Sequence, residues 1–313
     1  MKKNVIMWAS VLFLAFILLV PVGLATEQTV DEVPYGVHIL EDGSVDPADS
    51  PISRDGDVYT LTGDITFSIV IEKDNITVDG AGYTLFGRVA QYNGGVAIDY
   101  RHGVNVKNLV VRDTYRGFDL TFAEDNTIVG NTIINSAKAI YFWWSWRNNV
   151  TNNTITQAEY AIEFFLSPNY WSQNNIVTKN VVTDSNIGIS IMESNNTFAD
   201  NTINTSTIGV SVSGYQNVFR NNTINSEGIG FRDTGFDNIV DETNLVNGKP
   251  IIYWIGQQDK TVPSSAGQVF LSNCKNVTAQ NLNVNGITLS SSTDCIIAGN
   301  RITDGRSGIE MIK

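Results

Sequence analysis

Cysteine, histidine and basic residues are scarce in this chain. Its 313 residues include two cysteines and two histidines, and 20 Lys and Arg stand against 32 Asp and Glu, for a formal net charge of -12. Two cysteines do not build a disulfide framework, and an acidic chain is poorly suited to nucleic acid or to an anionic membrane surface. We therefore expect no nucleic-acid partner, and contact with a membrane only through the N-terminal segment.

Motifs for common catalytic and metal chemistry are absent as well. Neither histidine, His38 or His102, lies in a G-x-S-x-G or cysteine-based nucleophile motif, and the C-x2-C and H-x3-H spacings of metal sites do not occur. The soft ligands that copper prefers are scattered beyond the first 25 residues, at Met192, Cys274, Cys295 and Met311. The sequence therefore predicts no metal site and no cofactor.

Helical periodicity is missing, and an asparagine repeat takes its place. Pairs of asparagines five residues apart recur at steps of 22, 27, 21 and 21 residues, as Asn126/Asn131, Asn148/Asn153, Asn175/Asn180, Asn196/Asn201 and Asn217/Asn222. Apolar residues alternate with polar ones between these pairs, which is typical of strands. A period of about 22 residues marks a solenoid, so the sequence predicts an all-β, single-stranded parallel β-helix of about 10 coils. Asparagine tolerates left-handed backbone at sharp bends and bonds to its counterparts in neighbouring coils, which favours a scaffold role for the repeat.

The chain divides into four predicted parts. Residues 1–25 combine Lys2 and Lys3, an apolar run and small residues, as in a secretory signal peptide or an N-terminal anchor. Residues 26–57 are a turn-rich lead-in and cap, and residues 58–313 form the β-helix, with an enlarged coil at 244–281. The strand-like segment 308–312 has no capping element after it, so a truncated C-terminus is one expectation.

Two segments resemble a known family. The run from Gly43 through Asp55 to Tyr83 is similar to the opening of exported β-helix proteins common in archaea, and residues 244–254, NLVNGKPIIYW, resemble the signature of the NosD-type periplasmic copper-binding family. The resemblance implies a right-handed parallel β-helix grouped with carbohydrate-binding and sugar-hydrolysing domains. It says less about activity, because this fold carries lyases, hydrolases, adhesins and maturation factors.

One outer face of the predicted helix collects acids and aromatic rings. Strand alternation places two rows of residues on this face, about 4.8 Å apart from coil to coil. The candidate catalytic residues are Asp99, Asp119 and Glu163, and the candidate substrate-binding residues are Arg101, His102, Tyr141, Trp143 and Phe165. Stacked carboxylates repel one another, which raises a pKa and suits glycosidic cleavage. We expect Tyr141 and Trp143 to be largely exposed, beside a groove along the solenoid axis.

Several functions remain open at this point. The first hypothesis is an extracellular or cell-surface protein that binds polysaccharide or another surface component without chemistry. The second is a polysaccharide lyase or glycoside hydrolase that uses the three carboxylates, although polygalacturonase-like enzymes of this fold carry an Asp-Asp pair, which this chain lacks. A third is a NosD-like periplasmic copper maturation factor, and a fourth is that the acids are merely a solvated face.

Overall fold

The computed structural model describes residues 36–87, 94–166, 172–205, 207–232, 237–303 and 308–312. The chain divides into two units, Met1–Val33 and Pro34–Lys313, and the predicted signal peptide at 1–25 lies outside the described residues. The described part is all β, with no helix, and therefore none that could span a membrane. It is a parallel β-solenoid of about 11 turns, as the repeat predicts.

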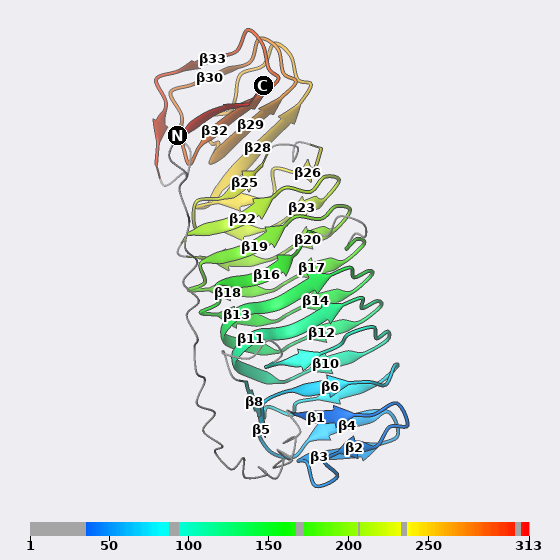
Figure 1. The fold of residues 1–313 in the computed structure, drawn as a ribbon. Coiled ribbons are helices and arrows are strands. Elements are labelled where there is room, and N and C mark those ends of the chain that lie inside the picture. The colour runs from blue at the N-terminus through cyan, green and yellow to red at the C-terminus, as the bar shows by residue number, and fades with distance from the viewer. Residues whose placement is uncertain are drawn as a thin grey trace, which may run out of the picture. The chain divides into compact units, whose positions relative to one another are not determined.

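Each coil contributes strands to three columns, and the coils stack in sequence order (Figure 1). The first column is a 10-stranded sheet: β3 (Ile52–Asp55), β4 (Val58–Leu61), β7 (Thr77–Asp79), β10 (Asn105–Lys107), β12 (Thr127–Val129), β14 (Asn149–Thr151), β17 (Ile176–Thr178), β20 (Thr197–Ala199), β23 (Val218–Arg220) and β26 (Ile239–Val240). The second column comprises β5 (Ile65–Thr66), β8 (Thr84–Phe86), β15 (Thr154–Thr156), β18 (Val181–Thr183), β21 (Thr202–Asn204), β24 (Thr223–Ile224) and β27 (Leu245–Val246). The third comprises β1 (Val37–Ile39), β6 (Ile69–Ile71), β9 (Val96–Ala97), β16 (Tyr160–Phe164), β19 (Ile187–Ile191), β22 (Ile208–Val212) and β25 (Ile229–Phe231).

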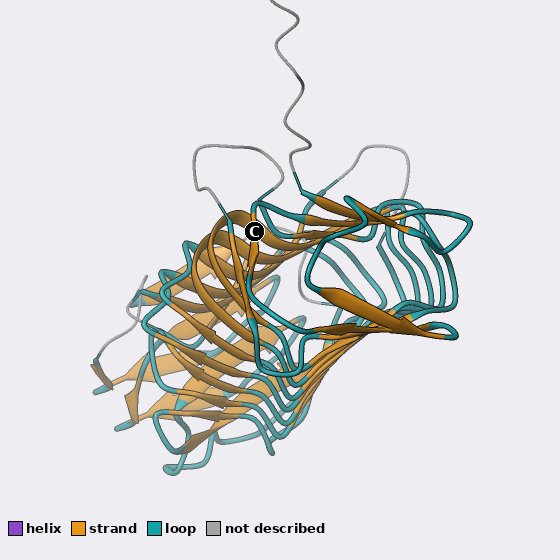
Figure 2. Ribbon diagram, turned by 90° about the horizontal axis from the view of Figure 1, so that it is seen from below, coloured by secondary structure: helices purple, strands orange, loops and turns teal. Residues whose placement is uncertain are grey.

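Two long strands bend from the second column into the third. They are β11 (Val110–Thr121) and β13 (Thr132–Trp143), of 12 residues each, and they pair in register from Val110↔Thr132 to Thr121↔Trp143. Viewed from the end of the solenoid, the strands form the walls and the turns form the corners (Figure 2). At the N-terminal end, β1 pairs in parallel with β6 and antiparallel with β2 (Val45–Asp46).

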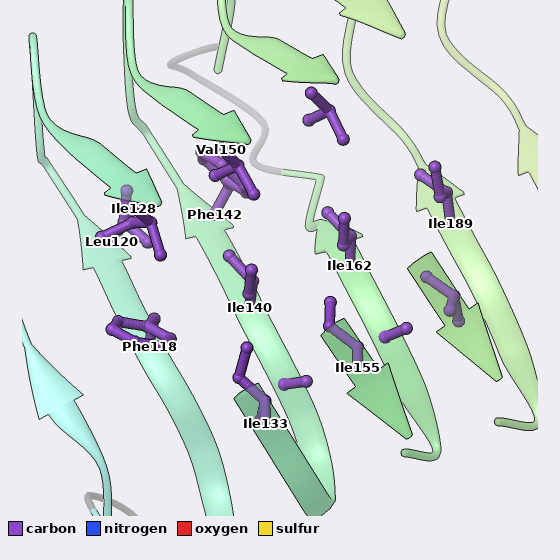
Figure 3. Packing of buried hydrophobic residues seen from close by; sticks show 14 of the residues in the cluster. Phe118, Leu120, Ile128, Ile133, Ile140, Phe142, Val150, Ile155, Ile162 and Ile189 are labelled. Carbon is purple, nitrogen blue, oxygen red and sulfur yellow. The ribbon is translucent and has the colours of Figure 1, made fainter. Parts of the chain in front are cut away.

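The interior is filled by one apolar residue per coil at each inward position. Ile133, Ile155, Val182, Ile203 and Ile224 form one such row, and each is fully buried. Phe118 and Leu120 of β11 align with Ile140 and Phe142 of β13 on the inner face (Figure 3). Because each coil covers its apolar face only with the next coil, the stack is stabilised by neighbours rather than by one central core.

Asparagine side chains bond the coils at two corners. The first asparagine ladder runs from Asn126 to Asn238 and the second from Asn131 to Asn244, both buried. In the first, Asn148 donates through its backbone and side-chain amides to Oδ1 of Asn175, at 2.9 and 3.0 Å. Left-handed backbone falls on the preceding residue, such as Asn152 (φ 56), and not on the ladder asparagine itself, which corrects one part of our expectation.

The last coils continue the solenoid with a shorter period. Strands β30 (Thr278–Gln280) and β31 (Asn283–Val284) pair with β33 (Ile296–Ala298) and β34 (Arg301–Ile302), and Thr278 lies opposite Ile296, 18 residues on. The amide of Leu282 donates to Oδ1 of Asn300 at 2.9 Å. Leu282, and not Asn281, therefore holds the ladder position in this coil, as Leu109 does before Asn131.

The apolar interior is divided into two cores near residue 250. The C-terminal sheet consists of β28 (Lys249–Ile255), β29 (Gln268–Ser272), β32 (Ile287–Ser290) and β35 (Ile309–Ile312). Within β28, Ile251 belongs to the first core with Tyr253 packed against it, whereas Ile252 belongs to the second core. Alternation along one strand thus gives each core one face of β28, which lies at the C-terminal end of the long stack (Figure 1).

Candidate functional site

The third strand column brings three of the predicted residues side by side. Asp119 on β11 pairs with Tyr141 on β13, and Tyr141 pairs with Glu163 on β16. All three face outward, because their neighbours Phe118, Ile140 and Ile162 point into the core. Strand phase therefore predicts this part of the row, and the physical reason is simple alternation.

Two cations from the bend between the second and third columns hold these acids. Nη1 of Arg116 lies 2.5 Å from Oδ2 of Asp119, and Nζ of Lys138 lies 2.7 Å from Oε2 of Glu163. The hydroxyl of Thr121 donates to the other oxygen of Asp119 at 2.7 Å. Burial opposes the charge of Arg116, but the charge and hydrogen bond of Asp119 outweigh it and raise the pKa of the guanidinium.

Tyr141 lies beneath both cations. Its ring centre is 4.0 Å from the guanidinium carbon of Arg116 and 4.7 Å from Nζ of Lys138. The side chain is buried, with only 4% of its surface exposed, and burial raises the pKa of its hydroxyl to about 12. The expected exposure of Tyr141 is therefore wrong. The cause is the bend, which carries two long basic side chains over the strand face.

Asp99 is displaced from the row that the sequence predicts. The structure pairs Ala97 with Asp119, and the amide of Tyr100 donates to the carbonyl of Thr121 at 2.9 Å. Asp99 thus lies beside Thr121, two residues further along the strand. The prediction is wrong here because Val96 and Ile98 both point inward. The sequence alone does not show which of the two aligns with Phe118 in the next coil, and the wrong choice shifts Asp99 by two residues.

The carboxyl group of Asp99 has an unusual environment. Its Oδ1 atom is buried and has no hydrogen-bond partner among the described residues. Burial, followed by the negative charge of Asp119, raises the pKa of Asp99 to about 7, against the lowering effects of Arg116 and of a backbone hydrogen bond. A carboxyl group with such a pKa can exchange a proton near neutral pH.

Arg101 and His102 turn away from these carboxylates. Nη1 of Arg101 donates to the carbonyl of Glu72 at 2.8 Å and lies 3.8 Å from Asp74. Nδ1 of His102 lies 3.2 Å from the same aspartate. Both residues therefore join a separate polar group at the neighbouring corner, and the structure does not bring them together with Asp119 and Glu163.

Aromatic rings from consecutive coils gather at the end of the third column. Tyr100 stacks on Phe122 with ring centres 4.6 Å apart and planes 9° from parallel, and Phe122 meets Trp144 edge-on at 4.3 Å. Trp143 is half-buried rather than largely exposed as expected, and it lies 5.0 Å from Trp144. Tyr100 is 62% exposed. We call these four residues, Tyr100, Phe122, Trp143 and Trp144, the aromatic ladder.

Three ladder residues adopt a backbone conformation that bulky side chains rarely take. The φ angles of Tyr100, Phe122 and Trp144 are 59°, 52° and 55°, in the left-handed region that favours glycine and asparagine. In the C-terminal coils, Asn273 and Ser291 follow the strand with the same left-handed backbone. An aromatic ring at such a corner costs about 1–2 kcal/mol, and strain of this kind is concentrated at functional sites.

Sequence reasoning overlooked four residues of this region. Arg116 and Lys138 stand 22 residues apart, as do Tyr100 and Phe122. That spacing equals the local period and was the available signal. Phe165, which the sequence did predict, is 39% exposed, and its ring lies 6.1 Å from that of Tyr141. Phe165 therefore lies beside the buried ion pairs, on the side that faces solvent.

The described residues do not fit a copper site. Nδ1 of His38 is bound to Glu72 at 2.7 Å, and that of His102 is paired with Asp74. Cys274 is buried, and its thiol contacts the carbonyls of Trp254 and Ser272. No three His, Cys, Asp or Glu side chains are grouped as metal ligands in the described part of the chain.

Three solved structures are similar to this chain at low sequence identity. An alginate lyase from Paenibacillus sp. str. FPU-7 is 15% identical, with 79% of this chain and 91% of the lyase covered and a TM-score of 0.37. The catalytic domain of a GH87 α-1,3-glucanase is 12% identical, with coverages of 81% and 61% and a TM-score of 0.39. A DFA-IIIase from Arthrobacter chlorophenolicus A6 without its lid is 14% identical, with coverages of 82% and 62% and a TM-score of 0.34. With TM-scores of 0.39 or less, these similarities carry no conclusion about this chain.

A comparison with protein families matches part of the chain. No curated protein sequence matches the chain. A family model does match, over a stretch that contains the Gly43 to Tyr83 run and ends before residues 244–254. Residues 35–170 match the family described as periplasmic copper-binding protein (NosD), which confirms the resemblance over that part of the chain.

Proposed function

We propose that this protein binds a carbohydrate chain along the outer face of the third strand column, through the aromatic ladder. The observation that carries the proposal is the stack of Tyr100, Phe122 and Trp144 at three successive corners with left-handed backbone. Sugar rings present apolar C–H faces that pack on aromatic rings, while their hydroxyls need polar partners. Tyr100 is exposed and the other three ladder residues are half-buried, and an aromatic cluster that reaches the surface often marks a contact surface.

The spacing of the ladder suits an extended ligand. Consecutive coils lie about 4.8 Å apart, and the ring centres of Tyr100 and Phe122 follow that spacing at 4.6 Å. Asp99, which is half-buried, and Phe165, which is 39% exposed, lie on the same strand column and add one polar and one apolar group. A polymer with repeating units can therefore make similar contacts at several coils.

Binding without cleavage is the function that the charges favour. Asp119 and Glu163 are bound to Arg116 and Lys138 in buried pairs, so neither carboxylate is free to act as a nucleophile or to activate water. Glycosidases need two carboxyl groups that flank the bond to be cleaved. Oδ1 of Asp99 and Oε2 of Glu163 are both buried without a hydrogen bond, but Oε2 of Glu163 lies 2.7 Å from Nζ of Lys138, whereas Asp99 has no ion pair among the described residues.

A carbohydrate-active enzyme is the second candidate, and Asp99 is the reason. Its pKa of about 7 would allow the carboxyl to donate a proton near neutral pH. This candidate predicts the release of reducing ends or of unsaturated products from a polysaccharide panel, and the loss of that activity in Asp99→Asn. The binding proposal predicts no product release, and retention on polysaccharide that survives Asp99→Asn.

We further propose that the protein is exported and acts at the cell surface or outside the cell. The support is the matching family, which is described as periplasmic, together with the apolar N-terminal segment after Lys2 and Lys3. Fractionation of cells that express the full chain tests this proposal. Recovery of the protein in the cytoplasm with its N-terminus intact would contradict it.

The binding proposal is tested by replacing a ring with a residue that suits the backbone better. In Tyr100→Asn the ring is lost, but asparagine favours φ 59, so the fold should be unchanged or more stable by up to about 1 kcal/mol. Retention on a polysaccharide affinity gel should fall sharply. Tyr83→Asn is the matched control, because Tyr83 is 38% exposed and lies away from the ladder. Equal retention of Tyr100→Asn and the wild type would refute the proposal.

A further inference from the structure

A pocket of about 330 Å³ lies where the two cores meet. Its lining comes from β22 and β25 of the long stack and from β29, β32 and β35 of the C-terminal sheet. Ligand pockets span about 300–1,000 Å³, so this one has room for a ligand of one or two rings. Nothing in the function proposed above accounts for it.

The pocket exists because a side chain takes the place of a strand. The amide of Gln268 accepts a hydrogen bond from the backbone N–H of Ile229 at 3.1 Å and donates to its carbonyl at 2.8 Å. These are the bonds that a strand of the next coil would otherwise make. Gly228 permits the close approach, since a Cβ atom there would lie 2.4 Å from Oε1 of Gln268. A side chain is narrower than a strand, and space remains beside it.

The lining combines an apolar floor with polar walls. The rings of Phe231 and Phe270 meet edge-on, 4.8 Å apart and nearly perpendicular, and both border the pocket. The hydroxyls of Ser211 and Thr288 also line it, and no hydrogen bond joins either one to another described residue. A sugar ring has matching chemistry, with one apolar C–H face and several hydroxyl groups around its edge.

Charge selects among sugars. The ionisable residues in the lining are Glu227, Glu310 and Arg232, which sum to one net negative charge. The whole chain carries a formal net charge of -12. A uronate would bring a further negative charge to this surface and be repelled, whereas a neutral sugar can accept from Arg232 and donate to the two carboxylates.

The pocket and the aromatic ladder lie on one strand column. Register connects Tyr141 to Glu163, Glu163 to Ser190 and Ser190 to Ser211. Three steps of about 4.8 Å place the pocket roughly 14 Å beyond the coil of Trp143. Two sites on one extended ligand raise its affinity without new contacts, because the second binding event becomes intramolecular.

We propose that this pocket is a second subsite that holds a neutral sugar unit of the carbohydrate chain bound at the aromatic ladder. The inference rests on the proposed function and adds a ligand class, namely neutral rather than uronate glycans. It also predicts that affinity increases with ligand length until both subsites are occupied.

The test fills the pocket without straining the backbone. A Cβ atom at Gly230 meets nothing closer than the carbonyl of Val210 at 3.9 Å, and its φ is not in the left-handed region. Gly230→Leu therefore places a side chain in the pocket. Thr223→Leu is the matched control, since Thr223 faces outward on β24 and pairs with Leu245 in the next coil, where leucine is already accommodated.

Isothermal titration calorimetry with cellohexaose, laminarihexaose, hexamannuronate and hexagalacturonate gives the readout. We expect one of the neutral hexasaccharides to bind at least about tenfold tighter than either uronate, and Gly230→Leu to weaken it about tenfold or more while Thr223→Leu does not. If Tyr100→Asn weakens binding and Gly230→Leu does not, the pocket inference is wrong and the ladder proposal stands. If only Gly230→Leu weakens it, the ladder proposal is wrong. Preference for a uronate overturns the inference alone, and no binding of any of the four ligands contradicts both proposals.

Discussion

The ion pair between Lys138 and Glu163 offers the sharpest test of how the charged cluster is held. Nζ and Oε2 are 2.7 Å apart, and the two side chains are 17% and 4% exposed. At an effective dielectric constant of about 20, that separation corresponds to roughly 6 kcal/mol of gross Coulomb attraction. In Lys138→Met the stem that covers Tyr141 and Phe165 is kept in part, but Glu163 is left charged, buried and alone. Removing one partner of a buried pair costs about 3–5 kcal/mol, so we expect a loss of about 3 kcal/mol or more.

Urea unfolding at pH 7 followed by far-UV circular dichroism measures this loss, and hydrogen exchange of β13 and β16 amides shows whether it is local. The control is Lys73→Met, because Lys73 lies 3.7 Å from Asp57, whose side chain is 66% exposed. An exposed pair of that kind contributes less than about 1 kcal/mol.

A second variant separates the pair from other effects of the substitution. In Lys138→Met/Glu163→Leu both charges are replaced by apolar groups, and such replacements of buried pairs are often neutral or stabilising. We expect the double variant to recover most of the lost stability. The reasoning is refuted if Lys138→Met costs less than about 1 kcal/mol, or if the double variant is as unstable as the single one.

Three further predictions concern other parts of the chain. Asn153→Ala should lower the free energy of unfolding in urea by roughly 3 kcal/mol. It leaves unsatisfied the two amide groups of Asn131 that bond to Oδ1 of Asn153, and other buried groups, at about 1–3 kcal/mol each. A cost below about 1 kcal/mol would show that water replaces the ladder bonds. The folded-state pKa of Asp99, about 7, lies above its ordinary value of 3.8. Between these pH values the folded state holds a proton that the unfolded state has lost, so the free energy of unfolding should decline as pH rises from about 4 toward 7. Asp99→Asn should flatten that decline, and an unchanged profile would contradict the burial of this carboxyl. Both thiols are free, and burial raises the pKa of Cys274, so iodoacetamide should label Cys295 first in the folded protein; faster labelling of Cys274 would show that the second core is open.

The repeat predicts the fold because equivalent positions in successive coils have the same physical role. Inward residues such as Ile133 and Ile155 have no alternative to an apolar side chain, and the ladder asparagines satisfy buried backbone groups at a corner. The period therefore appears in the sequence wherever the coil is regular. It disappears after Asn244, where the coils shorten to 17 or 18 residues and leucine holds the ladder position at residue 282.

The candidate site could be predicted only in part, because adjacency and burial depend on different information. Strand alternation is enough to align Asp119, Tyr141 and Glu163. Their burial depends on the bend in β11 and β13, which directs Arg116 and Lys138 over the same face. Alternation within a strand says nothing of such a bend, so the sequence predicted an exposed tyrosine. The pocket between the two cores depends on an interruption of the regular stack of coils, which a periodic sequence pattern does not reveal.

The shared strand β28 has a consequence for self-association. A stack of coils ends in an open face whose strands can pair with another molecule, and such edges favour end-to-end polymers. Here Ile251, Tyr253 and Phe270 pack against the last coil of the first core, where Phe231 lies 5.2 Å from Tyr253. The C-terminal sheet crosses the end of the long stack instead of extending it in register, because Gln268 occupies the strand position beside Ile229. Loss of this sheet by proteolysis near Gly248 would therefore uncover the last coil of the long stack and favour end-to-end association.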